Sequence, residues 1–392
     1  MNTKIIKNKI KFNGSLTTLS PFNWYYTGFA HSDGALYFIV EKISGYLGFR
    51  VSPVFAIQLT ILSKDFIYDI AKYFGCGRIN ISKNLITFKV TDFKLIWNVI
   101  IPHFLSFPFL GRKFLVFKIF LICCTLLYPF YNKNQPFFNI FKILYLSFLM
   151  NEGTKRTLNE LKDLLIKIQK KAILYGQLEK NKEYLSKSLL TLLSNTKAPL
   201  EINSIPPQFK ILSKDYKIID KNKNLDLPIP YILGVIEGDG SFNISFLNSP
   251  SIYKFEFSIT TSIEDISILI LIKLRLGCGK IEVHDSWCRF LIHKVDELIN
   301  IIIPLIDSIP NYRVDRLSLI TSKLQNYKIW KDGIIKHKKK DFEFKKAENG
   351  KEALIKKNSL IQFISAAYNV HDSGKKRKLT LSQFLNLHNL KN

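Results

Sequence analysis

The 392-residue sequence predicts an α+β protein built from two tandem αββαββα-like units. An apolar helical stretch that ends in Asp-Gly occurs twice, as "YYTGFAHSDG" and "YILGVIEGDG". A Gly-Cys-Gly marker follows each copy, with Gly75 lying 42 residues after Asp33 and Gly277 lying 38 residues after Asp239. Two long copies in the same order indicate a divergent duplication and not a short-period solenoid.

Each copy follows one predicted order: apolar helix, Asp-Gly, strands, helix, Gly-Cys-Gly, strands, helices. The stretches "VFAIQLTILSKD" and "KFEFSITTSIED" precede the markers, and their Phe55 and Phe257 each stand 20 residues ahead of the first marker glycine. In the late strand "WCRFLIH", Cys288, Phe290 and Ile292 alternate with the other residues. Alternate side chains of a strand share a face, so these three predict a core face.

Composition shifts divide the chain into a tail (1–20), a first domain (21–174), a linker (175–227) and a second domain (228–392). The linker is predicted from its charge, Asn and Pro, as in "NTKAPLEINSIPPQ" and "IDKNKNLDLPIP". Lys, Asn, Ile, Phe, Tyr and Leu crowd the sequence, and their codons can be nearly all A and T. This bias indicates an AT-rich genome such as that of a fungal mitochondrion, so we predict an organelle-encoded protein of the mitochondrial matrix.

The charge predicts a polyanionic partner. Lys and Arg number 57 against 31 Asp and Glu, a formal charge of +26. Nucleic acid is the favoured partner, with a ribosome-like assembly or an anionic membrane as alternatives. The five cysteines form no Cys-x-x-Cys pair, which argues against structural zinc, and their odd number fits a reducing compartment.

One apolar stretch, Phe114 to Met150, resembles a membrane segment in composition. Lys118 and Lys142 interrupt it, and Pro129 breaks its longest uncharged run, Ile119 to Asn132. Because about 20 apolar residues are needed to span a bilayer, we predict buried helices, with a membrane segment as the alternative.

The two motif helices carry small residues four positions apart, Gly28 with Ser32 and Gly234 with Gly238. Residues at i and i+4 share a face, and small ones allow two helix backbones to approach closely. We therefore predict that these helices pack on each other through those four residues.

Close packing of the helices would bring the carboxylates of Asp33 and Asp239 together. Gly34 and Gly240, which follow them, suit left-handed helix caps. Paired carboxylates repel each other unless a cation lies between them, and hard oxygen ligands favour Mg²⁺. The alternative is that each Asp-Gly is only a helix stop followed by a turn.

"YTGFAHSDG" and "ILGVIEGDG" resemble the two motifs of a double-motif LAGLIDADG homing endonuclease. The resemblance covers about Pro21 to Lys171 and Pro228 to Leu390. It implies curved antiparallel sheets that form a basic saddle over duplex DNA, and cleavage of both strands of a long site with short 3′ overhangs. It also implies that Asp33 and Asp239 are the catalytic metal ligands, in a predicted Mg²⁺ site that includes Gly34 and Gly240.

The resemblance also implies a basic residue late in each unit that supports the hydrolytic water. Lys113, five residues after Pro108, matches this position. In the second unit Asp315 stands five after Pro310, with Arg313 and Arg316 nearby, so that helper is not identified. His31 and Glu237 stand where the name-giving Asp of the motif precedes the catalytic acid by two.

DNA contacts are expected from the polar strand faces, although a solvated sheet face has the same pattern. Gln, Lys and Arg can hydrogen-bond base edges or phosphates. The candidates are Gln58, Arg78, Lys254, Lys280, Arg289 and His293.

These observations predict a monomeric, Mg²⁺-dependent, site-specific double-strand DNA endonuclease that promotes intron homing and needs no obligate protein partner. The first alternative is an RNA maturase that assists splicing of its host intron and binds the intron RNA, alone or in addition. The second is an inactive relic of the family.

Overall fold

The computed structural model describes residues 21–43, 47–131, 133–151, 158–174, 227–246, 253–309, 321, 323–342, 350–370 and 379–390. The chain forms two compact units. Unit 1 comprises residues 1–37, 53–121 and 227–392, and unit 2 comprises residues 38–52 and 122–226. Both motif helices lie in unit 1. The domain division at residues 174 and 228 remains a prediction about the sequence repeat, because the compact units do not follow it.

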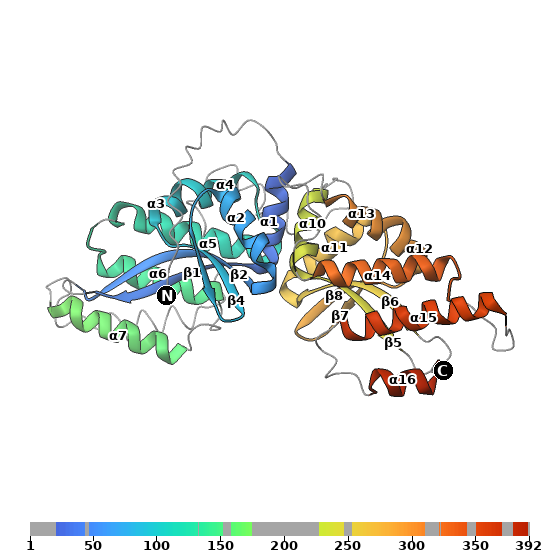
Figure 1. The fold of residues 1–392 in the computed structure, drawn as a ribbon. Helices are drawn as coiled ribbons and strands as arrows, with labels where there is room; N and C mark the ends of the chain where they lie inside the picture. The colour runs from blue at the N-terminus through green and yellow to red at the C-terminus, as the bar shows by residue number, and fades with distance from the viewer. Residues whose placement is uncertain are drawn as a thin grey trace. The chain divides into compact units, whose positions relative to one another are not determined.

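The first repeat runs in the predicted order (Figure 1). Its elements are α1 (Pro21–Asp33), β1 (Gly34–Lys42), β2 (Phe49–Thr60), α2 (Lys64–Phe74), β3 (Arg78–Ser82), β4 (Leu85–Val90), α3 (Phe93–Leu95), α4 (Ile101–Ser106) and α5 (Gly111–Leu127). The strands form an antiparallel four-stranded sheet in the order β1-β2-β4-β3. A π-helical turn joins α3 to α4.

The second repeat has the same order and the same sheet topology, β5-β6-β8-β7. Its elements are α10 (Ile229–Asp239), β5 (Gly240–Phe246), β6 (Tyr253–Ser262), α11 (Ile266–Leu276), β7 (Lys280–Val283), β8 (Trp287–Ile292), α12 (Val295–Glu297) and α13 (Ile303–Asp307), followed by α14 (Lys323–Lys338), α15 (Lys351–Val370) and α16 (Leu381–Leu387). A 3₁₀ turn, Ile263–Asp265, joins β6 to α11. The predicted α+β class with two pseudo-repeated αββαββα units is therefore confirmed.

The second sheet buries the face that the sequence predicts. Phe290 pairs with Ile259 and Ile292 pairs with Phe257, and all four are at most 1% exposed. Leu291 differs from the alternation, because it points to the other face and is still only 3% exposed. Its cross-strand partner Ser258 is equally buried, so part of that face is covered.

The predicted left-handed caps at Gly34 and Gly240 are wrong. Gly240 has φ −64° and ψ 143°, which is extended backbone, and Gly34 also starts a strand without a positive φ. Glycine is needed at these places for space, since a Cβ would lie 2.4 Å from the carbonyl oxygen of Ala30 and 2.5 Å from that of Ile236. Each motif helix therefore passes directly into a strand.

The left-handed caps occur instead at the Gly-Cys-Gly markers. Gly75 ends α2 with φ 61°, and Gly277 ends α11 with φ 67°. The N–H of each glycine donates to the carbonyl four residues before it, which ends the helix ahead of the third strand of the sheet.

Helices α1 and α10 cross at backbone contact, side by side in Figure 1. A Cβ on Gly28 would lie 2.1 Å from the carbonyl oxygen of Tyr231, and one on Gly234 would lie 2.1 Å from that of Tyr25. One turn further on, a Cβ on Gly238 would lie 2.3 Å from the Cβ of Ser32. The structure thus places all four small residues of the two motifs at this crossing.

The apolar stretch from Phe114 forms helices, as predicted. Helix α5 and a 3₁₀ turn continue through Pro129, and α6 (Phe137–Asn151) and α7 (Leu158–Leu174) follow. Phe117, Phe120 and Cys123 of α5 are at most 2% exposed. By length and composition, one helix among the described residues, Gly111–Phe130, would be able to cross a membrane, a test that core helices of other proteins also pass. This helix begins before the uncharged run and includes Lys118. The Lys118 side chain is only 6% exposed, so its charge does not end the helix.

We expect Gly234→Ala to lower the free energy of unfolding by at least about 1–3 kcal/mol, because the new methyl group meets backbone atoms that cannot rotate away. Urea denaturation of the full-length protein measures this. Gly350→Ala is the matched control, because a Cβ there meets nothing within 4 Å and should leave the midpoint unchanged. Equal midpoints for the two variants would show that the helices do not meet at Gly234.

Candidate active site

The crossing of α1 and α10 places the last residue of each helix, Asp33 and Asp239, at the same end. An ideal Cβ on Gly238 would lie 3.2 Å from Oδ2 of Asp33, so the first carboxylate reaches the backbone of the second helix. Burial, and then the charge of Asp239, raises the pKa of Asp33 to about 6. Burial likewise raises the pKa of Asp239, although a hydrogen bond from Ser32 opposes this shift.

Two partly buried carboxylates, each with a raised pKa, fit a divalent cation. No cluster of three or more His, Cys, Asp and Glu side chains suited to a metal occurs among the described residues, so the protein ligands of such a cation would be these two carboxylates. Mg²⁺ is commonly held by one or two carboxylates plus phosphate oxygens and waters. The residues present therefore fit this ion.

Lys113, the third residue of α5, lies beside Asp33. Its Nζ donates a hydrogen bond to the carbonyl oxygen of Gly34, so in this structure that predicted metal-site residue binds the lysine. Burial lowers the pKa of Lys113 to about 8, and the charges of Asp265, Asp239 and Asp33 oppose this shift.

Lys323, the first residue of α14, is the counterpart that the sequence reasoning missed. Its Nζ donates to the carbonyl oxygen of Gly238, directly before Asp239. Burial lowers the pKa of Lys323, and the charges of Glu237, Asp33 and Asp239 oppose this shift. Two partly buried lysines thus lie beside two partly buried carboxylates.

The distance from the preceding proline does not locate Lys323, because this distance differs between the two repeats. Lys323 lies 13 residues after Pro310, and not five as in the first repeat, whereas Asp315, Arg313 and Arg316 lie outside the described residues. A usable signal was present in the sequence, since "KFLVFKIF" from Lys113 and "KLQNYKIW" from Lys323 share lysines and aromatic residues at the same spacing.

The two departures from the family motif, His31 and Glu237, are buried and bind tyrosines of the opposite helix. The hydroxyl of Tyr25 donates to Oε2 of Glu237 at 2.8 Å, and the hydroxyl of Tyr231 lies 2.7 Å from Nδ1 of His31. These crossed pairs are related by the repeat but differ in chemistry. The other carboxylate oxygen of Glu237 accepts from the N–H of Thr321 at 3.0 Å, two residues before Lys323.

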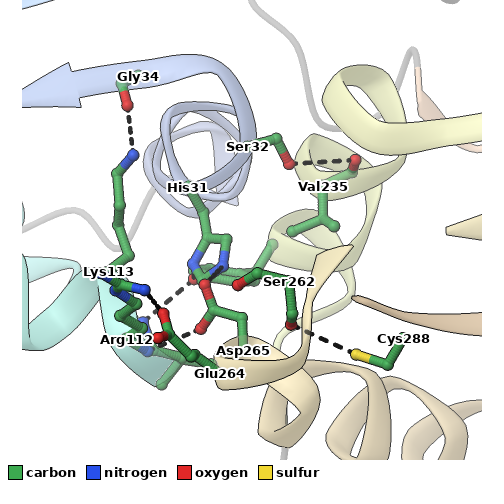
Figure 2. A network of polar contacts seen from close by, with 12 residues as sticks. His31, Ser32, Gly34, Arg112, Lys113, Val235, Ser262, Glu264, Asp265 and Cys288 are labelled. Atoms are coloured by element: carbon green, nitrogen blue, oxygen red, sulfur yellow. Dashed lines mark hydrogen bonds and ion pairs between the residues drawn. The ribbon is translucent and has the colours of Figure 1, made fainter. Parts of the chain in front are cut away.

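The His31 side chain faces Asp265 of the second repeat (Figure 2). Nε2 of His31 lies 3.6 Å from Oδ2 of Asp265, and Oδ1 of Asp265 accepts from the N–H of Arg112 at 2.7 Å. Burial alone would raise the pKa of Asp265, but His31 and this N–H hold the pKa below its ordinary value. The Arg112 side chain forms an ion pair with Glu264.

The basic residues predicted for the second sheet lie on its polar face. Arg289 pairs across the strands with Thr260 and Glu282, and its Nη2 lies 2.6 Å from Oε2 of Glu282. Lys280 lies 2.7 Å from the other oxygen of Glu282. Lys254 is exposed, 3.6 Å from Glu256 on the same face. His293 is exposed and lies just beyond the end of β8.

The first sheet presents exposed Gln58 and Arg78 on one face. Register pairs Gln58 with Thr87, and its Nε2 donates to the threonine hydroxyl at 3.1 Å. Arg78 pairs with Lys89 on the same side of the sheet. Both sheets therefore place the candidate DNA-binding side chains opposite the core, where they can meet a ligand.

Solved structures share this architecture. I-SmaMI, described as bound to uncleaved DNA target in the presence of calcium ions, matches with a TM-score of 0.61 at 19% identity, over 89% of this chain and 98% of that chain. I-GzeII in complex with its DNA target matches with a TM-score of 0.62 at 19% identity, over 89% of this chain and 98% of that chain. At these identities the structures show a common fold.

Two fungal proteins are similar in sequence. A probable intron-encoded DNA endonuclease 1 of Mycosarcoma maydis is 25% identical over 285 residues, which cover 72% of this chain and 90% of that protein. A probable intron-encoded endonuclease 2 of Neurospora crassa is 24% identical over 343 residues, which cover 86% of this chain and 64% of that protein.

The family model of the LAGLIDADG endonucleases matches residues 26–124 and 232–334. These two ranges cover half of the chain, and each contains most of one motif helix, one sheet and one of the two lysines beside the aspartates. The chain therefore belongs to the LAGLIDADG endonuclease family and carries two copies of its motif in one polypeptide.

Proposed function

We propose that this chain is a site-specific endonuclease that cleaves both strands of a DNA duplex at the ends of α1 and α10. The observation that carries this proposal is the juxtaposition of Asp33 and Asp239 with one partly buried lysine beside each. Two carboxylates and two lysines around a pseudo-twofold crossing supply one set of groups for each strand of a duplex.

Mg²⁺ is the proposed cofactor, held by Asp33 and Asp239. When bound, such an ion polarises a phosphoryl oxygen and lowers the pKa of a bound water. The calcium ions named for the structure of I-SmaMI with uncleaved DNA support a requirement for a divalent cation. The protein contributes the buried acid pair, whose mutual repulsion a cation relieves.

Lys113 and Lys323 are the proposed helpers of the two cleavage reactions. Each lysine is held by a carbonyl next to its aspartate, which fixes the ammonium group beside the metal ligands. A preorganised cation in a buried site stabilises the negative charge that develops on a phosphate in the transition state. With its lowered pKa, Lys113 is also suited to exchange a proton with water near neutral pH.

The two polar sheet faces are proposed to bind the DNA duplex as a basic saddle. Arg78, Lys254, Lys280 and Arg289 supply charge for phosphates, and Gln58 and His293 supply hydrogen bonds for base edges. The solved structures of I-SmaMI, I-GzeII and I-LtrWI with DNA targets support a double-stranded partner. The formal charge of +26 acts in the same direction.

We further propose a role in intron homing, which the fungal relatives named as intron-encoded endonucleases support. Synthesis in mitochondria is proposed from the AT-rich bias of the sequence, and action as a monomer from the two motifs in one polypeptide. The maturase alternative is not favoured, because the similar proteins are named for nuclease activity and both catalytic-position acids are present.

Asp33→Asn or Asp239→Asn should slow cleavage of both strands on the order of a thousandfold, because each removes a carboxylate from a shared site. The assay uses intronless DNA spanning the insertion site of the host intron, with Mg²⁺ and a separate label on each strand. DNA affinity should stay within a few-fold of wild type. Asp163→Asn, on the exposed face of α7, is the matched control and should cleave normally. Full cleavage by either site variant would refute the shared acid pair.

Asp33→Asn should also stabilise the metal-free protein at neutral pH. The raised pKa of Asp33 means that the folded state favours the protonated acid, so its contribution to stability is present below about pH 4 and is lost as the pH rises through 6. In EDTA, urea unfolding should show the variant up to about 3 kcal/mol more stable than wild type near pH 7.5 and no such gain near pH 4. Mg²⁺ should then raise the melting temperature of the wild type and not of the variant. The same Mg²⁺ response in both proteins would exclude Asp33 as a ligand.

Lys113→Met and Lys323→Met should each slow the cleavage of one strand, and not the same strand, by about 10- to 100-fold. Separate labels on the two strands report both rates in one reaction. Methionine keeps the apolar length of the side chain and removes the ammonium group, with its charge and its hydrogen bond to the carbonyl beside the aspartate. Equal loss on both strands in either variant would contradict the assignment of one lysine to each strand.

A further inference from the structure

The segment that sets the position of Lys113, Leu110 to Arg112, belongs to the first repeat but is bound by the second. The N–H of Leu110 donates to the hydroxyl of Tyr231 on α10 at 3.2 Å. The N–H of Arg112 donates to Oδ1 of Asp265 at 2.7 Å. These two amides lie at the start of α5, and the first N–H groups of a helix have no acceptor within the helix itself.

Gly111, between these two amides, lies directly against Asp265. Its φ is 57°, a left-handed conformation that favours glycine, and a Cβ would lie 2.1 Å from Oδ1 of Asp265. The backbone of the first repeat therefore turns around one carboxylate oxygen of the second. Lys113 is the second residue after this turn, so a shift of the turn would move its ammonium group.

His31 joins the two second-repeat residues that hold this segment. The Tyr231 hydroxyl oxygen accepts from the N–H of Leu110 and lies 2.7 Å from Nδ1 of His31. When the hydroxyl donates to Nδ1, the ring proton of neutral His31 is on Nε2, which faces Oδ2 of Asp265 at 3.6 Å. Figure 2 shows His31 and Asp265 pointing toward each other beside Arg112 and Lys113. Both side chains are largely buried, at 4% and 14% exposure, so water competes little for these contacts.

The Lys323 side is held differently. Glu237, which corresponds to His31 in the repeat, binds the N–H of Thr321 without an intermediate residue. The position that corresponds to Asp265 is Ser63, which is 3% exposed and carries no charge. An acid at the end of this 3₁₀ turn is therefore present in one repeat and replaced in the other.

We propose that Asp265, with His31 and Tyr231, is a positioning residue that holds the start of α5 so that Lys113 can act on one DNA strand. We call these three residues the Lys113 clamp. The proposal rests on the function proposed above for Lys113. It predicts that loss of the clamp impairs one cleavage reaction and spares the other.

Asp265→Ala should slow the strand that Lys113→Met slows, by about 10- to 100-fold, because a misplaced catalytic group costs rates of that order. The other strand should be cut within about threefold of the wild-type rate, so that nicked duplex accumulates. Asp265→Asn keeps an oxygen acceptor for the N–H of Arg112 and should restore most of the lost rate. Glu264→Ala is the matched control: it removes the neighbouring carboxylate, which forms its ion pair with the Arg112 side chain and not with the Arg112 N–H, and should cut both strands normally.

Hydrogen exchange of the amides in residues 107–117 supplies a measurement that does not depend on cleavage. Asp265→Ala should speed exchange at Arg112 at least about tenfold, whereas Glu264→Ala should not. Unchanged exchange in Asp265→Ala would overturn the clamp whatever the nuclease does. Changed exchange with equal slowing of both strands, or with slowing of the Lys323 strand, would overturn its strand-specific role. A wild-type protein that cuts neither strand, or a Lys113→Met variant that cuts both normally, would instead overturn the proposed function.

Discussion

The backbone contact between Gly28 and Gly234 is the constraint on which the rest of the site depends. Because neither residue has a Cβ, the carbonyl of Tyr25 and the carbonyl of Tyr231 can lie where side chains would otherwise stand. At that separation the last residues of α1 and α10 fall together, and the two tyrosine hydroxyls can reach the opposite helix. The absence of a Cβ at Gly28 and Gly234 thus allows both the pairing of the two aspartates and the two hydrogen bonds between the repeats.

The repeat preserves geometry more strictly than chemistry. The crossed tyrosine bonds occur on both sides, yet one ends on a carboxylate, Glu237, and the other on an imidazole, His31. Glu237 accepts the N–H of Thr321, near Lys323, directly. On the other side it is Asp265, facing His31, that accepts the N–H of Arg112, near Lys113. The replacement of an acid in the first motif is thus matched by an acid in the second repeat. In a single polypeptide the two active-site halves are free to diverge in this way, since neither surface must complement a copy of itself.

Features that depend on local spacing can be predicted from the sequence, whereas features that depend on contacts with the other repeat cannot. Asp33, Asp239 and the small residues of the motif were predictable because helix periodicity fixes which residues share a face. Lys323 was missed because a longer connection before α14 changes its distance from Pro310, although its helix keeps the pattern of the Lys113 helix. Gly34 and Gly240 do not form the left-handed caps that the sequence predicts. A left-handed turn and a close carbonyl oxygen both favour glycine, and only the backbone conformation shows which of the two applies. Asp265 lies 153 positions from the amide it accepts, and no local pattern indicates such a partner.

Close packing and electrostatic strain are concentrated at the same helix ends. Burial raises the pKa of both aspartates and lowers the pKa of both lysines, so each charged group at the site is less stable there than in water. The opposite charges offset part of this cost, but the raised pKa of each acid shows that they do not offset all of it. The apolar and backbone contacts of the α1–α10 crossing, which do not titrate, must offset the remaining free-energy cost of burying these charges. A cation and a polyanion are the ligands that reduce this strain most directly, because one neutralises the acids and the other the lysines. Binding of the proposed cation and of DNA would therefore neutralise the charges that folding leaves uncompensated, which is the arrangement expected where binding energy is used for chemistry.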